Sequence, residues 1–167
     1  MEFTLEKWHM GFKESLQKYA DNPRVAIYLR NHFPCPYTLE NAEQYILSCE
    51  EKEGITQIVR AIVVNGQAVG SIGILFKNDV YTKTAELGFW LGEPFWHQGI
   101  ITAAIKPICD MAFANRDLVR IYAEVFAQNI GSRKALQKAD FELEGVLKKN
   151  VFKNGQIMDS CIYALVK

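Results

Sequence analysis

The chain has 167 residues, of which 49% are hydrophobic and 23% are charged, and its formal net charge is zero. Such a length and composition are typical of one globular domain with a substantial core, so we expect a single domain over residues 1–167. The balanced charge excludes a basic surface of the kind that holds nucleic acid or an anionic membrane. No apolar run is long enough to span a bilayer, and the N-terminus lacks a signal pattern, which predicts a soluble, cytoplasmic protein.

The cysteines are scattered along the chain: Cys35, Cys49, Cys109 and Cys161. No two of them have C-x-x-C spacing. The histidines, His9, His32 and His97, lack metal-ligand spacing among themselves or with the cysteines. We therefore expect buried free thiols in a reducing compartment, without a disulfide framework and without a metal.

The first third of the chain is predicted to be mostly helical. Short helices are expected in ESLQKYA, residues 14–20, and in PRVAIYLR, residues 23–30. A stronger helical pattern covers residues 38–54, where Thr38 is a candidate N-cap and Gly54 can end the helix. Its apolar side chains share one face: Leu39, Ala42, Ile46 and Cys49.

Three strand-like runs follow, at residues 56–64, 67–76 and 84–92, each rich in β-branched and aromatic residues. Asn65-Gly66 joins the first two runs and is a strong hairpin signal, because both positions tolerate a positive φ. The middle of the chain is therefore predicted to be an antiparallel meander.

The second half alternates helices and strands. The stretch PFWHQGIITAAIKPICDMAF, residues 94–113, runs from a turn into a helix. The apolar face of this helix is predicted to be Ile101, Ile105, Ile108 and Ala112. A strand at residues 119–127, a short helix at 131–139 and a hairpin at 146–166, turning at Asn154-Gly155, complete the chain.

The helix that follows residues 84–91 and precedes residues 119–127 forms a strand–helix–strand crossover. Such a crossover places its two strands side by side and parallel. The helix then begins at the C-terminal end of the first strand, where ligands of α/β sheets usually bind. Gly99 lies at this helix start, where it serves either a tight turn or a backbone cradle for an anion.

Two stretches carry a family resemblance: AELGFWLGEPFWHQGIITAAI and VRIYAEVFAQNIGSRKALQKADFELEGVL. They resemble the GNAT superfamily of acyl-CoA-dependent N-acetyltransferases, and within it the branch of ribosomal-protein alanine N-acetyltransferases (RimJ/RimL-like). NPRVAIYLRNHFPCPYTLENAEQYI and GQIMDSCIYALV, near the two ends, also fit this branch. The resemblance implies an α/β fold with a mixed α+β sheet. That sheet would be mostly antiparallel and twisted, splayed between two parallel central strands, with helices on both faces.

The resemblance also implies that the loop before the long helix wraps the pyrophosphate of coenzyme A with successive backbone N–H groups. The family pattern, Arg/Gln-x-x-Gly-x-Gly/Ala, falls on Trp96, Gly99 and Ile101, and only the middle glycine matches. Ala103 stands where the branch usually has a glutamate. The main-chain donors would be Gln98, Gly99, Ile100, Ile101 and Thr102, and His97 lies in the same loop.

Two further segments would complete an acetyl-CoA site. The backbone of Phe89, Trp90 and Leu91 corresponds to family positions that pair with the pantetheine arm. The segment AQNIGS matches the branch pattern Ala-x-Asn-x-x-Ser. By this resemblance Asn129 bonds the amide groups of the cofactor, and Ser132 contacts it.

Acetyl transfer needs a neutral amine, a stabilised carbonyl oxygen and a proton for the departing thiolate. Glu86 is the candidate general base, because it is an acid among apolar residues on the strand that leads to the loop, where the family often places its base. A structural role as an edge-facing, salt-bridging glutamate stays open for it. Ser132 is either the acid that protonates the thiolate or only the N-cap of its helix. The tyrosine that other members use is replaced by Gln137.

These inferences predict an acetyl-CoA-dependent N-acetyltransferase that acts on a primary amine, with a protein N-terminal amine as the first candidate acceptor. The alternatives are a small-molecule amine, such as a polyamine or drug-like amine, and a non-catalytic acyl-CoA-binding module. The last is suggested by Ile101, Ala103 and Asp140, which depart from the family pattern. The expected partner is the amine acceptor, without nucleic acid or membrane, for a monomer or a homodimer.

Overall fold

The computed structural model describes residues 1–167. One sheet contains the strands β1 (Thr4–Lys7), β2 (Gln57–Val64), β3 (Gln67–Phe76), β4 (Thr84–Leu91), β5 (Arg120–Phe126), β6 (Glu142–Lys153) and β7 (Gln156–Val166). The helices are α1 (Lys13–Ala20), α2 (Pro23–Ala26), α3 (Leu39–Lys52), α4 (Ile100–Asn115) and α5 (Ile130–Lys138), with short 3-10 turns η1 (Met10–Phe12), η2 (Asp79–Tyr81) and η3 (Glu93–Phe95). None of the helices has the length and hydrophobicity needed to cross a membrane.

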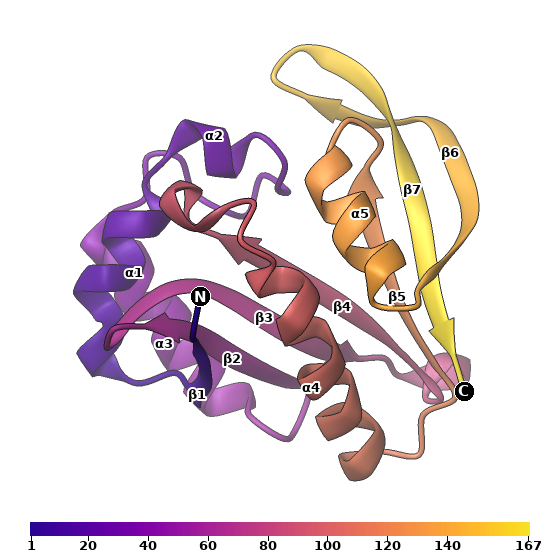
Figure 1. The fold of residues 1–167 in the computed structure, drawn as a ribbon, viewed down its shortest axis with the longest axis horizontal. Coiled ribbons are helices and arrows are strands. Elements are labelled where there is room, and N and C mark those ends of the chain that lie inside the picture. The colour runs from indigo at the N-terminus through magenta and orange to yellow at the C-terminus, as the bar shows by residue number, and fades with distance from the viewer.

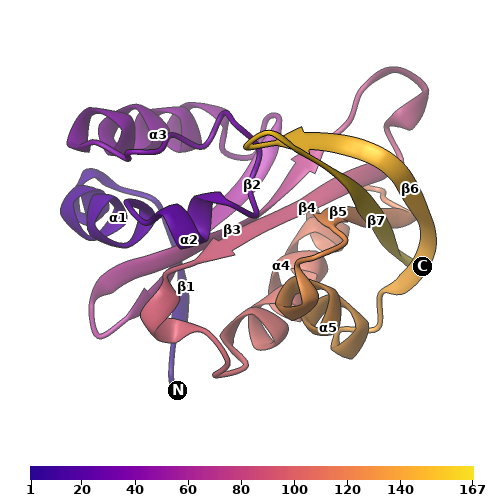
Figure 2. The same cartoon turned by 90° about the horizontal axis from the view of Figure 1, so that it is seen from above.

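The sheet has the strand order β1-β2-β3-β4-β5-β7-β6, and only the β4–β5 pair is parallel. Helices α1 and α3 cover one face, and α4 and α5 cover the other (Figure 1 and Figure 2). Because successive residues of a strand point to opposite faces, β2 supplies both core clusters. Ile58 and Ile62 pack with the residues of α4, whereas Val59 and Ala61 pack with those of α1 and α3. The predicted mixed fold with helices on both faces is confirmed.

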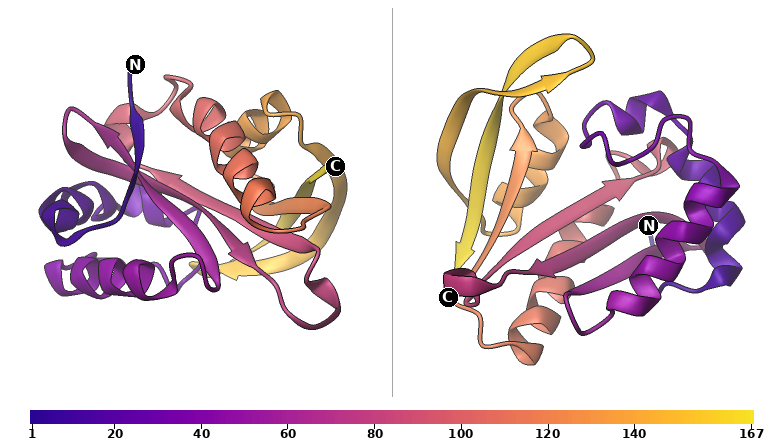
Figure 3. Two further views of the ribbon diagram at one scale, coloured as in Figure 1. Left: turned by 90° about the horizontal axis from the view of Figure 1, so that it is seen from below. Right: turned by 180° about the vertical axis from the view of Figure 1, so that it is seen from behind.

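The parallel pair is hydrogen-bonded only at its start. Its register ends at Glu86 opposite Tyr122. Beyond this point β4 and β5 diverge in a V that opens away from the C-terminus (Figure 3). Each strand stays paired on its outer side, β4 with β3 as far as Leu91 and β5 with β7 as far as Phe126. The gap between the strands therefore has two supported walls, and the predicted splay is confirmed.

Local sequence signals account for several of these elements. At the start of α3, Thr38 Oγ1 accepts from the Asn41 N–H at 3.1 Å, and Asn41 Oδ1 accepts from the Thr38 N–H at 2.9 Å. This reciprocal pair satisfies two N–H groups that a helix leaves free, and it confirms the predicted cap. The hairpin at Asn65-Gly66, with φ of 49° and 75°, also forms as predicted.

The structure differs from the predictions in several places, and Leu39, predicted on the apolar face of α3, is 49% exposed. Strand β1 was not predicted, because it is a four-residue edge strand that pairs only with β2 and is mostly exposed. The helix predicted over residues 23–30 ends at Ala26, and Tyr28 and Leu29 line cavities instead of continuing it. Cys35 is exposed, whereas the other three cysteines are buried and free as predicted.

Candidate active site

A cavity of about 670 Å³, here called the cleft, lies at the open end of the V, between the end of β4 and the start of α5. Eleven of the residues predicted to bind a cofactor line it: Phe89, Trp90, Leu91, Trp96, His97, Gly99, Ile100, Ile101, Thr102, Asn129 and Ser132. Gln98 does not line the cleft, and its side-chain amide donates to the carbonyl of Pro94 at 3.0 Å. Two segments that are separate in the sequence, residues 89–102 and 129–132, therefore meet around one cavity.

The loop from β4 to α4 forms one wall of the cleft. Trp96 Nε1 donates to the carbonyl of Leu91 at 2.7 Å, which folds the loop back onto the strand end. Gly99 is the N-cap of α4 and has a φ of 76°, a left-handed conformation that suits glycine. No side chain caps this helix, so the first-turn N–H groups of residues 100–102 have no acceptor within the chain. At the positive end of the helix dipole, these groups can receive an anion.

The edge of β4 forms a second wall. Because the pairing with β5 ends at Glu86, the β4 edge from Gly88 to Leu91 has no strand partner on the side of the gap, although the Leu91 carbonyl is bonded to Trp96 Nε1. The opposite edge of the same residues is paired with β3, which holds the strand in the sheet. An extended chain can pair with such a free edge as an added strand.

Helix α5 provides the third wall, and its start differs from one prediction. Asn129 is the N-cap, and its Oδ1 accepts from the Ser132 N–H at 3.2 Å. The N-cap role considered for Ser132 is therefore wrong, because the helix begins two residues before it, at Ile130. The Ser132 hydroxyl has no hydrogen-bond partner in the protein, and it lines the cleft. The side-chain Nδ2 of Asn129 is likewise free to donate.

A second cavity, here called the groove, has a volume of about 400 Å³ and extends from the same gap toward α3. The groove and the cleft share a set of lining residues: Tyr28, Leu29, Phe89, Trp90, Asn129 and Ser132. A molecule held in the cleft and one held in the groove would therefore meet between the diverging strands.

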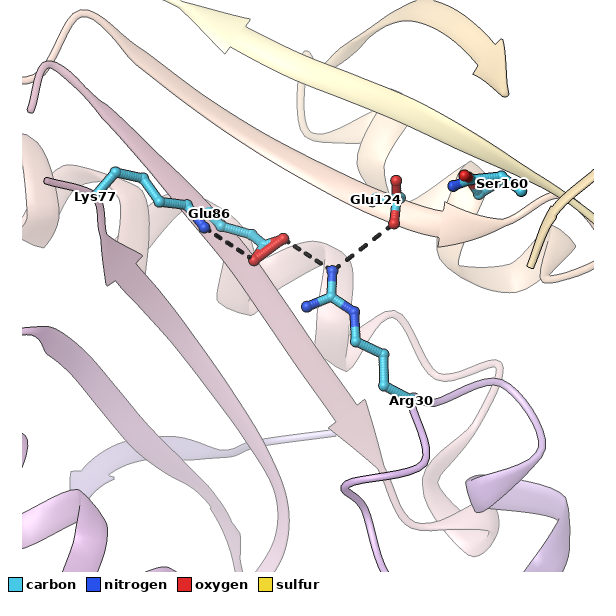
Figure 4. A network of polar contacts seen from close by, with 6 residues as sticks. Arg30, Lys77, Glu86, Glu124 and Ser160 are labelled. Atoms are coloured by element: carbon cyan, nitrogen blue, oxygen red, sulfur yellow. Dashed lines mark hydrogen bonds and ion pairs between the residues drawn. The ribbon is translucent and has the colours of Figure 1, made fainter. Parts of the chain in front are cut away.

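Glu86 lines the groove and is only 9% exposed. Its carboxylate faces two cations: Arg30 Nη2 lies 3.0 Å from Oε2, and Lys77 Nζ lies 3.5 Å from Oε1 (Figure 4). Arg30 Nη2 also lies 3.8 Å from Oε2 of Glu124, which projects from β5. Burial alone would lower the pKa of Arg30, but the hydrogen bond and the charge of Glu86 raise it by more. The net shift of the pKa is upward, so the guanidinium stays charged. Glu86 is thus salt-bridged, but on a central strand inside a cavity and not at an edge.

The wall of the groove near α3 is aromatic and uncharged. Phe33 lies between two other rings, with centroids 5.1 Å from Tyr37 and 5.6 Å from Trp90. Burial raises the pKa of the nearby Cys49 thiol to about 11, so this side chain is neutral at physiological pH. The charged network around Glu86 therefore faces an apolar wall.

Comparisons with known proteins agree with this architecture. Residues 3–142 match the model of the acetyltransferase (GNAT) domain. The chain belongs to the GNAT family. It is 38% identical over 84 residues to the probable N-acetyltransferase YjcK of Bacillus subtilis, covering 50% of this chain and 46% of YjcK. It is 32% identical over 97 residues to the ribosomal-protein-serine acetyltransferase of Escherichia coli, covering 57% of this chain and 54% of that protein.

A solved structure gives the fold-level match. RimL, described as a ribosomal L7/L12 α-N-protein acetyltransferase in complex with coenzyme A, superposes with a TM-score of 0.86. The match covers 98% of this chain and 93% of RimL at 18% identity, so it shows the fold alone. The two curated relatives match over about half of their own length. The family match confirms the predicted enzyme class, an N-acetyltransferase of the GNAT type.

One departure from the GNAT pattern has no effect on the backbone. Asp140 occupies the place of a usual glycine after α5, and it adopts the left-handed φ of 67° that the glycine would supply. The helix therefore stops where the family pattern requires. Pro107 lies within α4 on its exposed side, where we find no role for it.

The sequence did not single out several side chains of this GNAT site. Lys134 and Lys138 place positive charge along the cleft, and Arg24 also lines it but is ion-paired with Glu93. Lys134 and Lys138 are four residues apart and thus share one face of α5. This spacing is the only sequence pattern that could have indicated that the two lysines line one site. Arg30 and Glu124 enter the groove from a loop and from β5, and no sequence spacing links them to Glu86.

Proposed function

We propose that this chain transfers the acetyl group of acetyl-CoA to a primary amine, by direct attack of the amine on the thioester. The observation that carries the proposal is the meeting of the two cavities at Phe89, Trp90, Asn129 and Ser132. The cleft would hold the acetyl donor, and the groove would hold the acceptor. Their common lining is where a nucleophile and a thioester could approach each other, and such positioning alone can supply much of the rate.

The cleft offers a matching group for each part of acetyl-CoA. The free N–H groups of residues 100–102 and the ammonium groups of Lys134 and Lys138 suit the negatively charged phosphates. The unpaired edge of β4 suits the amides of the pantetheine arm, and the free Nδ2 of Asn129 offers a further donor. This set needs no metal.

In the chemical step, Glu86 would accept a proton from the incoming ammonium group, directly or through one water. The neutral nitrogen then forms a bond to the thioester carbon, and the carbon–sulfur bond breaks. The unbonded hydroxyl of Ser132 is the candidate donor of a proton to the departing thiolate, since it lines both cavities. Ser132 would regain a proton from the attacking nitrogen, which has to lose its second proton to become an amide. Glu86 would finally release the proton that it took to solvent.

A protein N-terminal amine is the first candidate acceptor, because two of the similar proteins are named as acetyltransferases of ribosomal proteins. One contact favours a small-molecule amine as the second candidate. Lys153, near the tip of the β6–β7 hairpin, donates to Asn31 Oδ1 at 3.0 Å. This bridge ties the hairpin to the loop that lines the groove, which would limit how far the groove can widen for a bulky acceptor.

A thiol-release assay with acetyl-CoA tests the proposal. The panel should contain peptides with free serine or alanine N-termini, the same peptides with blocked N-termini, and small amines such as spermidine and benzylamine. Turnover with the free but not the blocked peptides supports the first acceptor, and turnover only with small amines supports the second. If calorimetry shows tight acetyl-CoA binding while no amine is turned over, the chain is a non-catalytic acyl-CoA-binding module and the proposal is wrong.

A further inference from the structure

Arg30 lines the groove and belongs to no helix or strand. It lies in the loop between α2 and α3, and its side chain is 54% exposed. A single nitrogen, Nη2, lies 3.0 Å from Glu86 and 3.8 Å from Glu124, between carboxylates that project from the two diverging strands (Figure 4). The carboxylates of Glu86 and Glu124 therefore share the positive charge of Arg30.

The three partners differ in how much they depend on this contact. The side chain of Glu86 is only 11% exposed and that of Glu124 is 24% exposed, so both carboxylates are poorly solvated. A buried carboxylate without a counterion is strongly disfavoured, whereas a half-exposed arginine is readily solvated by water when it leaves. Lys77, at 3.5 Å, would be the one cation left beside Glu86. Arg30 can therefore leave the pair easily only when another cation takes its place.

We propose that Arg30 is an internal counterion that the ammonium group of the acceptor displaces, so that the site between Glu86 and Glu124 is the acceptor's cation subsite. This inference rests on the proposed function and narrows the acceptor. A carboxylate next to the ammonium group would be forced against two acids, so the chain selects amines without an adjacent carboxylate. The aromatic wall of Phe33, Tyr37 and Trp90 adds a preference for an apolar or aromatic group beside the amine.

The exchange also prepares the chemical step. An ammonium group in the place of Arg30 Nη2 is within hydrogen-bonding distance of the Glu86 carboxylate. One proton passes from this nitrogen to Glu86, which leaves a neutral amine and a neutral carboxylic acid. The amine is then no longer held by charge and can move to the thioester between β4 and β5. Arg30 would thus delay proton transfer until a cationic acceptor arrives.

Binding of three matched probes, without acetyl-CoA, tests the inference independently of turnover. L-phenylalaninamide has the ammonium and the ring, L-phenylalanine adds the carboxylate, and 3-phenylpropionamide lacks the amine. Calorimetry should be done on the parent, Arg30→Ala and Arg30→Gln, where the second variant keeps a hydrogen-bond donor if the first does not fold. Arg120→Ala is the matched control, since Arg120 is paired with Glu144 outside both cavities.

We expect both Arg30 variants to bind L-phenylalaninamide about threefold to fivefold more tightly than the parent, because a competing ion pair has been removed. Arg120→Ala should match the parent, and 3-phenylpropionamide should gain nothing. Weaker, unchanged or undetectable binding of L-phenylalaninamide in both variants would overturn the inference. It would also be overturned if the parent prefers L-phenylalanine and the variants lose that preference, because Arg30 would then be a carboxylate-binding residue. A lack of turnover with tighter amide binding would contradict only the proposed function.

Discussion

The cleft and the groove share a boundary, but they are built in different ways. The cleft takes part of its polar character from backbone groups, namely the first turn of α4 and the free edge of β4, and the rest from side chains of one further continuous segment, α5 and its cap. The polar character of the groove comes from the side chains of Arg30, Lys77, Glu86 and Glu124, which come from four separate parts of the chain. A site made of backbone tolerates many side-chain changes, whereas a site made of side chains depends on each of them. Variants should therefore separate donor binding from chemistry and acceptor binding.

Glu86→Gln is expected to have the largest effect. Glutamine keeps the size and much of the hydrogen bonding of Glu86 but cannot accept a proton. We expect kcat to fall by about 10²–10⁴-fold, the usual contribution of a positioned general base. Calorimetry should show an almost unchanged Kd for acetyl-CoA, because Glu86 does not line the cleft.

Glu124→Gln is the matched control for that variant, because it removes a carboxylate from the same network at the longer distance of 3.8 Å from Arg30. We expect it to alter the KM for the acceptor more than kcat. Parent-like turnover of Glu86→Gln near neutral pH would show that the amine loses its proton to bulk water, and Glu86 would then have only a structural role.

The reactivity of Cys49 should report on how dry the groove is. Burial raises the pKa of this thiol to about 11, so at pH 8 it holds about a hundredfold less thiolate than a thiol of ordinary pKa. Alkylation by iodoacetamide should be slow at pH 8 and should accelerate about tenfold with each pH unit toward 11. Mass spectrometry of peptides over this pH range measures the rate, and rapid modification at pH 8 would show that water enters the groove freely.

Two other thiols calibrate that experiment. Cys109 in α4 is buried in the core, where burial raises the pKa of its thiol to about 12, so it should react more slowly than Cys49. Cys35 is exposed and should be alkylated first. The predicted order of modification is therefore Cys35, Cys49 and Cys109.

The contrast between the two cavities also explains what the sequence could predict. Hairpin turns, the α3 cap and the crossover between β4 and β5 follow from short-range patterns, and they were predicted. The cleft follows from the motifs around Gly99 and Asn129, because each motif is continuous in the chain. Arg30 and Glu124 were missed, since 56 residues separate Arg30 from Glu86 and only the tertiary fold brings them together. Ser132 was considered a cap because the exact start of α5 depends on which residue first turns helical.

Gly99→Val tests the backbone character of the cleft. Valine strongly disfavours the φ of 76° that Gly99 adopts, so the first turn of α4 should shift and its N–H groups should lose their common direction. We expect the Kd for acetyl-CoA to rise at least tenfold, or about 1.4 kcal/mol, while Cys49 reactivity in the groove stays the same. Isothermal calorimetry measures the change.

Gly66→Val is a matched control for the strain. Gly66 has a φ of 75° and, like Gly99, no atom within 4 Å of an added Cβ, but it lies in the β2–β3 turn. The Gly66→Val variant should lose about as much melting temperature as Gly99→Val, but it should bind acetyl-CoA as tightly as the parent. If a folded Gly99→Val protein binds acetyl-CoA as tightly as the parent, the start of α4 does not bind the pyrophosphate.

The smallest effects are expected for substitutions of Asn129 and Ser132, and they distinguish a role in capping α5 from a role in catalysis. Asn129→Ala removes the side-chain oxygen that caps α5, which should cost about 1 kcal/mol of stability and lower the melting temperature by roughly 2–4 °C. Asn129→Ser restores a capping oxygen without the amide, so it should recover stability but not any lost acetyl-CoA affinity. Ser132→Ala removes a hydroxyl with no partner in the protein, so it should slow turnover several-fold and leave the melting temperature unchanged. Measuring both the melting temperature and kcat of each variant distinguishes the two roles. If Ser132→Ala loses stability but keeps the kcat of the parent, Ser132 takes no part in catalysis.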